Sequence, residues 1–156
     1  MNLNISDHEF RRVQSFIFNA AGISLSPAKK ALVCGRLAKR LRARSIENYA
    51  DYMALVESGH EPQEKQIAVD LLTTNETYFF REPKHFDLLR QWATSTRSTG
   101  QPWRVWSAAS STGEEAYTIA MVLSDCLEGR PFEVVGTDIS TRVLARARTG
   151  HYPMER

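Results

Sequence analysis

The 156-residue sequence predicts an α/β protein, with an all-α helical amino-terminal domain followed by the first βαβα portion of a parallel sheet. Apolar residues recur at helical spacing through the first part of the chain. The pattern then changes to short apolar runs that alternate with helical segments. Between the two lies TSTRSTGQP, a small and polar stretch typical of a linker. We therefore predict a helical domain over residues 1–93, a linker over 94–102 and a partial α/β domain over 103–156.

The first part is predicted to hold five helices. SDHE at residues 6–9 fits a capping box, and the helix that it opens should end at Gly22. The other four helices are expected, in order, from about Pro27, over about residues 46–56, after Pro62 and from Pro83.

The second part reads as strand, helix, strand, helix. WRVWSA is predicted as a buried strand, GEEAYTIAMVLSDCL as a helix, FEVVGTD as a second strand, and STRVLARARTG as a helix that ends at Gly150. This order is typical of a parallel sheet with crossover helices.

Composition excludes several classes of protein. With 42% hydrophobic and 24% charged residues the chain resembles ordinary soluble domains. No apolar run approaches the roughly 20 residues that span a bilayer, and MNLNISDHEF lacks the basic start and apolar core of a secretion signal, so we expect a cytoplasmic protein without membrane insertion. Cys34, Cys126 and the four histidines do not stand at ligand spacing, so no metal site is expected.

Basic residues are concentrated in the second predicted helix. Seven occur between Pro27 and Ile46, where there is no acidic residue. Four of them form a stripe that is a candidate for binding an acidic partner: Lys29, Arg36, Arg40 and Arg44. A solvated helix face and a grip on nucleic-acid phosphates are the alternatives. A net charge of only +2 and the absence of a recognition motif count against nucleic acid.

The loop in WSAASSTGEEAY is the first candidate site. Ligands of such sheets bind outside the carboxyl ends of the strands, and an acidic residue that ends the second strand commonly holds ribose hydroxyls. Gly113 is central in the loop, and Asp138 follows 25 residues later. Glu114 and Glu115 disfavour a pyrophosphate and favour a ligand with a ribose and positive charge, which S-adenosylmethionine has. The alternative is that these acids only favour a helix start and cap the next helix.

The second candidate site is TNETYFFRE, which places Asn75, Thr77 and Arg81 among three aromatic side chains. Such donors and aromatic faces suit an adenine or a substrate carboxylate. The alternative is a hinge in which the aromatic residues pack in the core and Arg81 pairs with Glu82.

Together these segments resemble the CheR family, the methyltransferases that esterify glutamates of bacterial chemoreceptors. The likeness is carried, in order, by TNETYFFRE, WSAASSTGEEAYTIAMVL and VVGTDISTRVLARARTGHY, and more loosely by the amino-terminal helices. It implies a helical domain joined to a Rossmann-like S-adenosylmethionine-dependent methyltransferase sheet. The implied product is S-adenosylhomocysteine, and the implied partner is the cytoplasmic helical region of a chemoreceptor.

The resemblance also implies roles for individual residues. Cofactor contacts fall on Asn75, Thr77, Arg81, Glu115 and Asp138, Gly113 lets the loop approach the ligand, and Arg81 also orients the reactants. Ala116 departs from the GEEPY that is frequent in the family. A complete sheet of this kind has about seven strands, whereas two are predicted here. We therefore expect self-association through the incomplete sheet, and a non-catalytic receptor-docking fragment is a further alternative.

Overall fold

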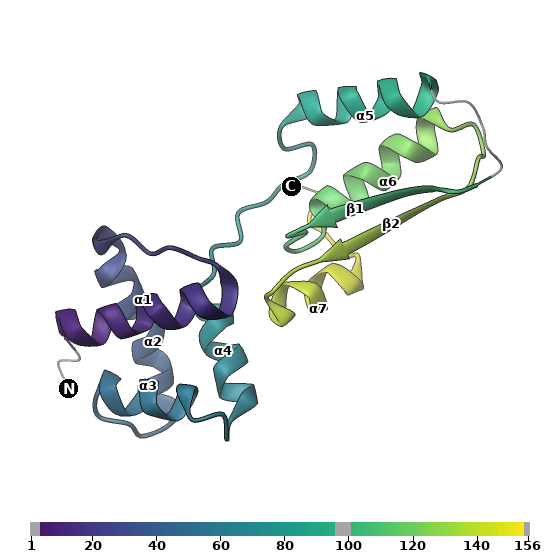
Figure 1. The fold of residues 1–156 in the computed structure, drawn as a ribbon. Helices are drawn as coiled ribbons and strands as arrows, with labels where there is room; N and C mark the ends of the chain where they lie inside the picture. Colours follow the sequence, from purple (N-terminus) through teal and green to yellow (C-terminus); the bar gives the residue numbers. More distant parts are fainter. Residues whose placement is uncertain (1–3, 96–100, 155–156) are drawn as a thin grey trace. The chain divides into compact units, whose positions relative to one another are not determined.

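A computed structural model describes residues 4–95 and 101–154. The chain forms two compact units that divide between Thr74 and Asn75 (Figure 1). Residues 96–100 of the predicted linker lie outside the described residues, and the two residues before them belong to a helix.

Four helices and a short 3₁₀ turn build the described part of the first unit, which starts at residue 4. In order they are α1 (Asp7–Ala21), the turn Pro27–Lys29, α2 (Lys30–Ala43), α3 (Tyr49–Glu57) and α4 (Pro62–Leu72). The capping box is confirmed, since Ser6 Oγ accepts from Glu9 N at 3.2 Å and Glu9 Oε2 accepts from Ser6 N at 2.8 Å. Gly22 ends α1 with a φ of 68°, in the left-handed region that suits glycine.

A buried carboxylate ties α2 and α3 to α4. Glu64 is only 2% exposed, and the Arg40 guanidinium donates to its two oxygens at 2.9 and 2.6 Å. The Tyr52 hydroxyl donates to the same carboxylate at 2.9 Å. Arg40 is thereby part of the packing of this unit, and its hydrogen bonds hold the pKa of Glu64 below its usual value.

The second unit contains the predicted βαβα order with one helix before it. Its elements are α5 (Pro83–Ser95), β1 (Trp103–Ala108), α6 (Glu114–Cys126), β2 (Phe132–Thr137) and α7 (Thr141–Thr149). The two strands pair in parallel, in a register that runs from Trp103 with Phe132 to Ala108 with Thr137. The α/β fold class is confirmed, and the carboxyl ends of both strands lie at one edge of the sheet (Figure 1).

The helix α5 packs with the second unit. Phe86 and Ala93 of this helix share a core with Ile119 and Leu123 of α6. Because of this packing the division falls after Thr74, earlier in the chain than the boundary predicted after residue 93.

The strands are not buried on both faces among the described residues. Their side chains alternate, so Trp103, Val105 and Phe132 pack toward the helices while Trp106 is 68% and Val135 48% exposed. The prediction that WRVWSA is a buried strand was therefore wrong for one face of the sheet in this part of the chain.

Candidate functional site

Asp138 joins the two loops that leave the carboxyl ends of the strands. Its Oδ2 accepts from the backbone N–H of Ser111 at 2.9 Å, and its Oδ1 accepts from that of Ser140 at 2.8 Å. The loop after β1 is also bound to β2, because the Ser110 N–H donates to the Thr137 carbonyl at 2.8 Å. The carboxylate that the sequence placed at the end of β2 is thus fixed beside the loop after β1.

This loop holds a strained backbone. Ala109 and Ser111 have φ values of 63° and 50°, in the left-handed region that non-glycine residues rarely adopt. Such conformations cluster at functional sites, where the surrounding contacts maintain them.

Gly113 is required by packing within the unit. Its φ is 100°, and a Cβ added there would lie 2.7 Å from the Tyr152 hydroxyl and 3.0 Å from Ala147 Cβ. Packing within the unit therefore explains this glycine by itself, and the close approach of the loop to a cofactor stays a prediction.

A cavity of about 300 Å³ lies between TNETYFFRE, the start of α5 and the loop after β1. Thr77 and Arg81 of the predicted site residues line it, together with Glu115 from the first turn of α6. Asn75 and Asp138 do not line this cavity, but Asp138 binds the backbone of Ser111, which does. The structure thus brings together residues from both candidate motifs.

The two adjacent glutamates have different environments. Glu114 is fully buried, and the Thr112 hydroxyl donates to its Oε2 at 2.6 Å. Glu115 is exposed to the cavity, and the buried Ser107 hydroxyl donates to its Oε1 at 2.7 Å. Glu115 is therefore the glutamate of this pair that is available to a ligand in the cavity.

Two buried hydroxyl groups next to Asp138 have no hydrogen-bond partner among the described residues. They are Ser111 Oγ and Ser140 Oγ, which belong to the residues whose backbone N–H groups bind the carboxylate. Buried polar groups are nearly always paired, so two unpaired hydroxyls in the residues that hold one carboxylate mark these loops as a candidate polar site. The donor set fits a ribose-bearing, positively charged ligand.

The aromatic residues of TNETYFFRE are not buried in a core as the alternative expected, since Tyr78 and Phe80 are 49% and 48% exposed and Tyr78 lines the cavity. Phe79 meets Tyr152 edge to face with ring centroids 4.9 Å apart, and the Phe80 N–H donates to Thr118 Oγ1 at 3.3 Å. Arg81 donates to the Glu76 carbonyl at 3.0 Å, so the predicted pair of Arg81 with Glu82 does not form among the described residues.

Sequence reasoning missed Ser107 and Tyr152. Ser107 stands eight residues before Glu115 with its side chain toward the helices, a position that strand alternation indicates. The Tyr152 hydroxyl donates to the Thr112 carbonyl at 2.6 Å, and burial raises its pKa to about 12. No local pattern singles out this tyrosine, because its partner lies 40 residues away.

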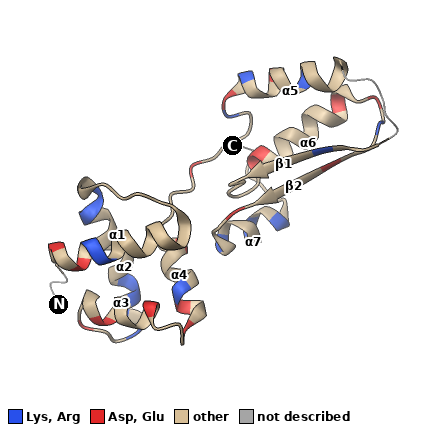
Figure 2. Cartoon of the chain, in the orientation of Figure 1, with Lys and Arg blue, Asp and Glu red and all other residues tan. Residues whose placement is uncertain are grey.

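The predicted basic stripe is largely engaged within its own unit. Arg36 donates to the Thr73 carbonyl at 3.1 Å, Arg40 binds Glu64, and Arg44 pairs with Glu61. Lys29 is exposed. Figure 2 shows basic residues on α1, α2 and α4 and acidic residues on α1, α3 and α4. Partner binding by the stripe stays a prediction, since three of its four members have internal contacts.

Comparison with protein families gives two matches, one for each unit. Residues 8–73 match the all-alpha domain of CheR methyltransferase, and residues 75–156 match its SAM binding domain. The chain belongs to the CheR methyltransferase family. The resemblance drawn from the sequence motifs is thereby confirmed, and the boundary between the two CheR domains coincides with the division between the compact units.

Curated relatives of this CheR-family chain include three described as chemotaxis protein methyltransferases. The Escherichia coli K12 protein is 45% identical over 155 residues, which cover 98% of this chain and 53% of the relative. Chemotaxis protein methyltransferase 2 of Pseudomonas aeruginosa is 43% identical over 150 residues, 95% of this chain and 53% of the relative. The Borreliella burgdorferi protein is 37% identical over 166 aligned positions, 100% of this chain and 59% of the relative. The chain thus spans about half the length of these relatives.

Neither a metal-binding cluster nor a membrane-spanning helix is found among the described residues. No group of three or more histidine, cysteine, aspartate or glutamate side chains within residues 4–95 and 101–154 is arranged to hold a metal ion. No helix of those residues is long and apolar enough to cross a membrane.

Proposed function

We propose that this chain binds S-adenosylmethionine as part of a chemotaxis methyltransferase that esterifies glutamate side chains of a chemoreceptor. The observation that carries the proposal is the pair of unpaired buried hydroxyls around Asp138, next to a cavity lined by Glu115. The family match and the names of the relatives support it. The cytoplasm, where the receptor's helical region lies, is the proposed location.

In this proposal different residues of the chain bind different parts of S-adenosylmethionine. Asp138 and the hydroxyls of Ser111 and Ser140 suit the ribose, because together they offer acceptors and donors at one point. The Glu115 carboxylate, fixed by Ser107, suits the positively charged end of the ligand. Thr77 and Arg81 line the same cavity as Glu115, and the predicted contact of Asn75 belongs to the same proposal. When bound, S-adenosylmethionine supplies a methyl group attached to a cationic sulfur.

The acceptor carboxylate needs little help from the protein. A glutamate side chain is already ionised at neutral pH, so the site requires no general base. Strong positive charge on this carboxylate would lower its reactivity. The protein therefore contributes alignment and exclusion of water, and we assign Arg81 to orientation of the reactants.

Transfer of tritium from methyl-labelled S-adenosylmethionine to a chemoreceptor cytoplasmic fragment tests the function. Base-labile methyl esters should form in the presence of this chain, and Arg81→Ala should reduce them by more than about tenfold while the far-UV circular dichroism stays unchanged. Lys84→Ala, an exposed cation three residues further on, is the matched control and should leave the rate unchanged. Cofactor binding without any ester would remove catalysis from this chain and leave the docking-fragment alternative.

A further inference from the structure

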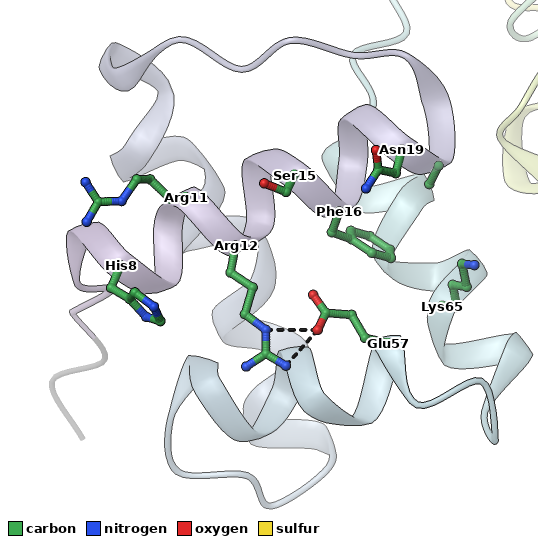
Figure 3. Close-up of a pocket in the computed structure, with 9 residues that line it drawn as sticks. His8, Arg11, Arg12, Ser15, Phe16, Asn19, Glu57 and Lys65 are labelled. Atoms are coloured by element: carbon green, nitrogen blue, oxygen red, sulfur yellow. Dashed lines mark hydrogen bonds and ion pairs between the residues drawn. The ribbon is translucent and has the colours of Figure 1, made fainter.

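A cavity of about 520 Å³ in the helical unit is lined by an ion pair that belongs to the packing of that unit. Figure 3 shows Arg12 of α1 reaching Glu57 of α3, and the guanidinium donates to Glu57 Oε2 at 2.9 and 2.6 Å. Arg12 also donates to the Ala50 carbonyl of α3 at 3.2 Å. These contacts join α1 to α3 and need no ligand to explain them. A side chain of the second unit has contacts that reach the candidate cofactor cavity instead.

Tyr152, which follows α7, contacts both segments that form the candidate cofactor cavity but does not line the cavity. Its ring meets Phe79 of TNETYFFRE edge to face, with centroids 4.9 Å apart. Its hydroxyl donates to the Thr112 carbonyl in the loop after β1 at 2.6 Å. The chain neighbours of these two partners, Tyr78 and Ser111, line the cavity. One side chain therefore connects the two segments from outside the cavity.

The hydroxyl of Tyr152 binds the loop at its strained part. Thr112 lies between Ser111, with a φ of 50°, and Gly113, with a φ of 100°. A non-glycine residue keeps a left-handed conformation only where surrounding contacts hold it. The N–H of Ser111 is also the group that donates to Asp138 Oδ2 at 2.9 Å. The bond from Tyr152 thus acts on the residue next to the one that binds the carboxylate.

The Tyr152 hydroxyl is a stable donor at neutral pH. Burial, and then the nearby Glu114 carboxylate, raise the pKa of Tyr152 to about 12, so the hydroxyl keeps its proton. The hydroxyl also packs tightly on the loop, since a Cβ added at Gly113 would lie 2.7 Å from it. A hydrogen bond and close packing therefore act together at this point of the loop.

We propose that Tyr152 is a positioning residue of the cofactor site, which holds the loop after β1 and TNETYFFRE in the arrangement that directs the Ser111 N–H to Asp138. The proposal deepens the proposed function and rests on it, because this is the site proposed to bind S-adenosylmethionine. Tyr152 acts through Thr112 and Phe79 and does not touch the ligand. The alternative is a tyrosine that only stabilises the packing of the unit.

Isothermal titration calorimetry with S-adenosylmethionine tests the proposal on a pair of matched variants. Tyr152→Phe keeps the ring and removes the hydroxyl, and we expect it to weaken cofactor binding about fivefold or more. Tyr117→Phe is the control, because the Tyr117 ring packs on Tyr152 with centroids 5.7 Å apart and its hydroxyl donates to the Ala147 carbonyl of α7 at 3.0 Å. The control should stay within about twofold of the parent, whereas a purely structural role predicts equal effects of the two variants.

Two further measurements separate positioning from general stability. If Tyr152 acts through the loop that binds Asp138, the double variant Tyr152→Phe/Asp138→Asn should weaken binding less than the product of the two single effects. Amide hydrogen exchange, followed by NMR, needs no cofactor. The Ser111 N–H should exchange about fivefold or more faster in Tyr152→Phe than in the parent, and at the parent's rate in Tyr117→Phe.

Equal exchange of the Ser111 N–H in the two tyrosine variants would overturn the proposal, and so would independent effects of Tyr152→Phe and Asp138→Asn on affinity. Cofactor binding that is indifferent to Tyr152→Phe would retire the positioning role and leave the proposed function intact. A parent chain that binds no S-adenosylmethionine but shows the expected exchange pattern would retire the proposed function alone, and the hold of Tyr152 on the loop would stand.

Discussion

Replacing Glu64 with alanine should destabilise the helical unit strongly. The variant leaves the Arg40 guanidinium and the fully buried Tyr52 hydroxyl without their shared acceptor. Removal of one partner of a buried ion pair costs about 3–5 kcal/mol. Because the Arg40 side chain is 26% exposed and regains some hydration, we expect the lower end of this range, about 3 kcal/mol.

Urea unfolding followed by far-UV circular dichroism measures this loss. Glu61→Ala is the matched control, since it removes a carboxylate whose pair with Arg44 is about one third exposed on both sides. Such exposed pairs contribute at most about 1 kcal/mol. The three tryptophans lie outside the helical unit, so their fluorescence reports on the other unit in the same samples. A loss from Glu64→Ala no larger than that from Glu61→Ala would refute the structural role given to Arg40.

Three further predictions follow from particular contacts. The folded-state pKa of Glu64 lies below its ordinary value of 4.5, so its ion pair with Arg40 stabilises the unit above about pH 4.5, and this contribution is lost as the pH falls further. The Glu64→Gln variant should therefore show a smaller fall in the free energy of unfolding at acid pH than the parent. An equal fall in both proteins would contradict this prediction. Gly113→Ala should lower the free energy of unfolding of the second unit, followed by tryptophan fluorescence in urea, by about 1–2 kcal/mol. The reason is that residue 113 has a φ of 100° and that an added Cβ would meet the Tyr152 hydroxyl. An unchanged urea midpoint would contradict this prediction, because it would show that the loop relaxes without cost. Because Trp106 and Val135 leave one face of the sheet exposed, we expect the chain to self-associate through the sheet. Light scattering measures this, and a monodisperse monomer would contradict the prediction.

Local sequence signals predicted most of the fold. The capping box at Ser6, the prolines that open α4 and α5, and the change from helical to strand periodicity all act over a few residues, so they can be read directly. The motifs also indicated Thr77, Arg81 and Glu115, which the structure places around one cavity.

The rest depended on contacts between distant residues. The stripe on α2 gave no sign that Arg40 would bind Glu64, because the two stand 24 positions apart and a solvent-facing helix has the same spacing. The domain boundary after residue 93 ignored the packing of Phe86 of α5 on α6, which sequence periodicity does not specify. Likewise, the two unpaired hydroxyls around Asp138 become visible only when the loops are placed together.

Binding of S-adenosylmethionine, followed by isothermal titration calorimetry, tests the central claim most directly. Glu115→Gln and Asp138→Asn remove the two carboxylates of the site, and Glu133→Gln removes an exposed carboxylate on β2 as a control. We expect binding of S-adenosylmethionine and not of a nicotinamide dinucleotide, with affinity reduced about tenfold or more by each site variant and unchanged by the control. Binding of the dinucleotide in preference, or cofactor affinity that is indifferent to Glu115 and Asp138, would contradict the account.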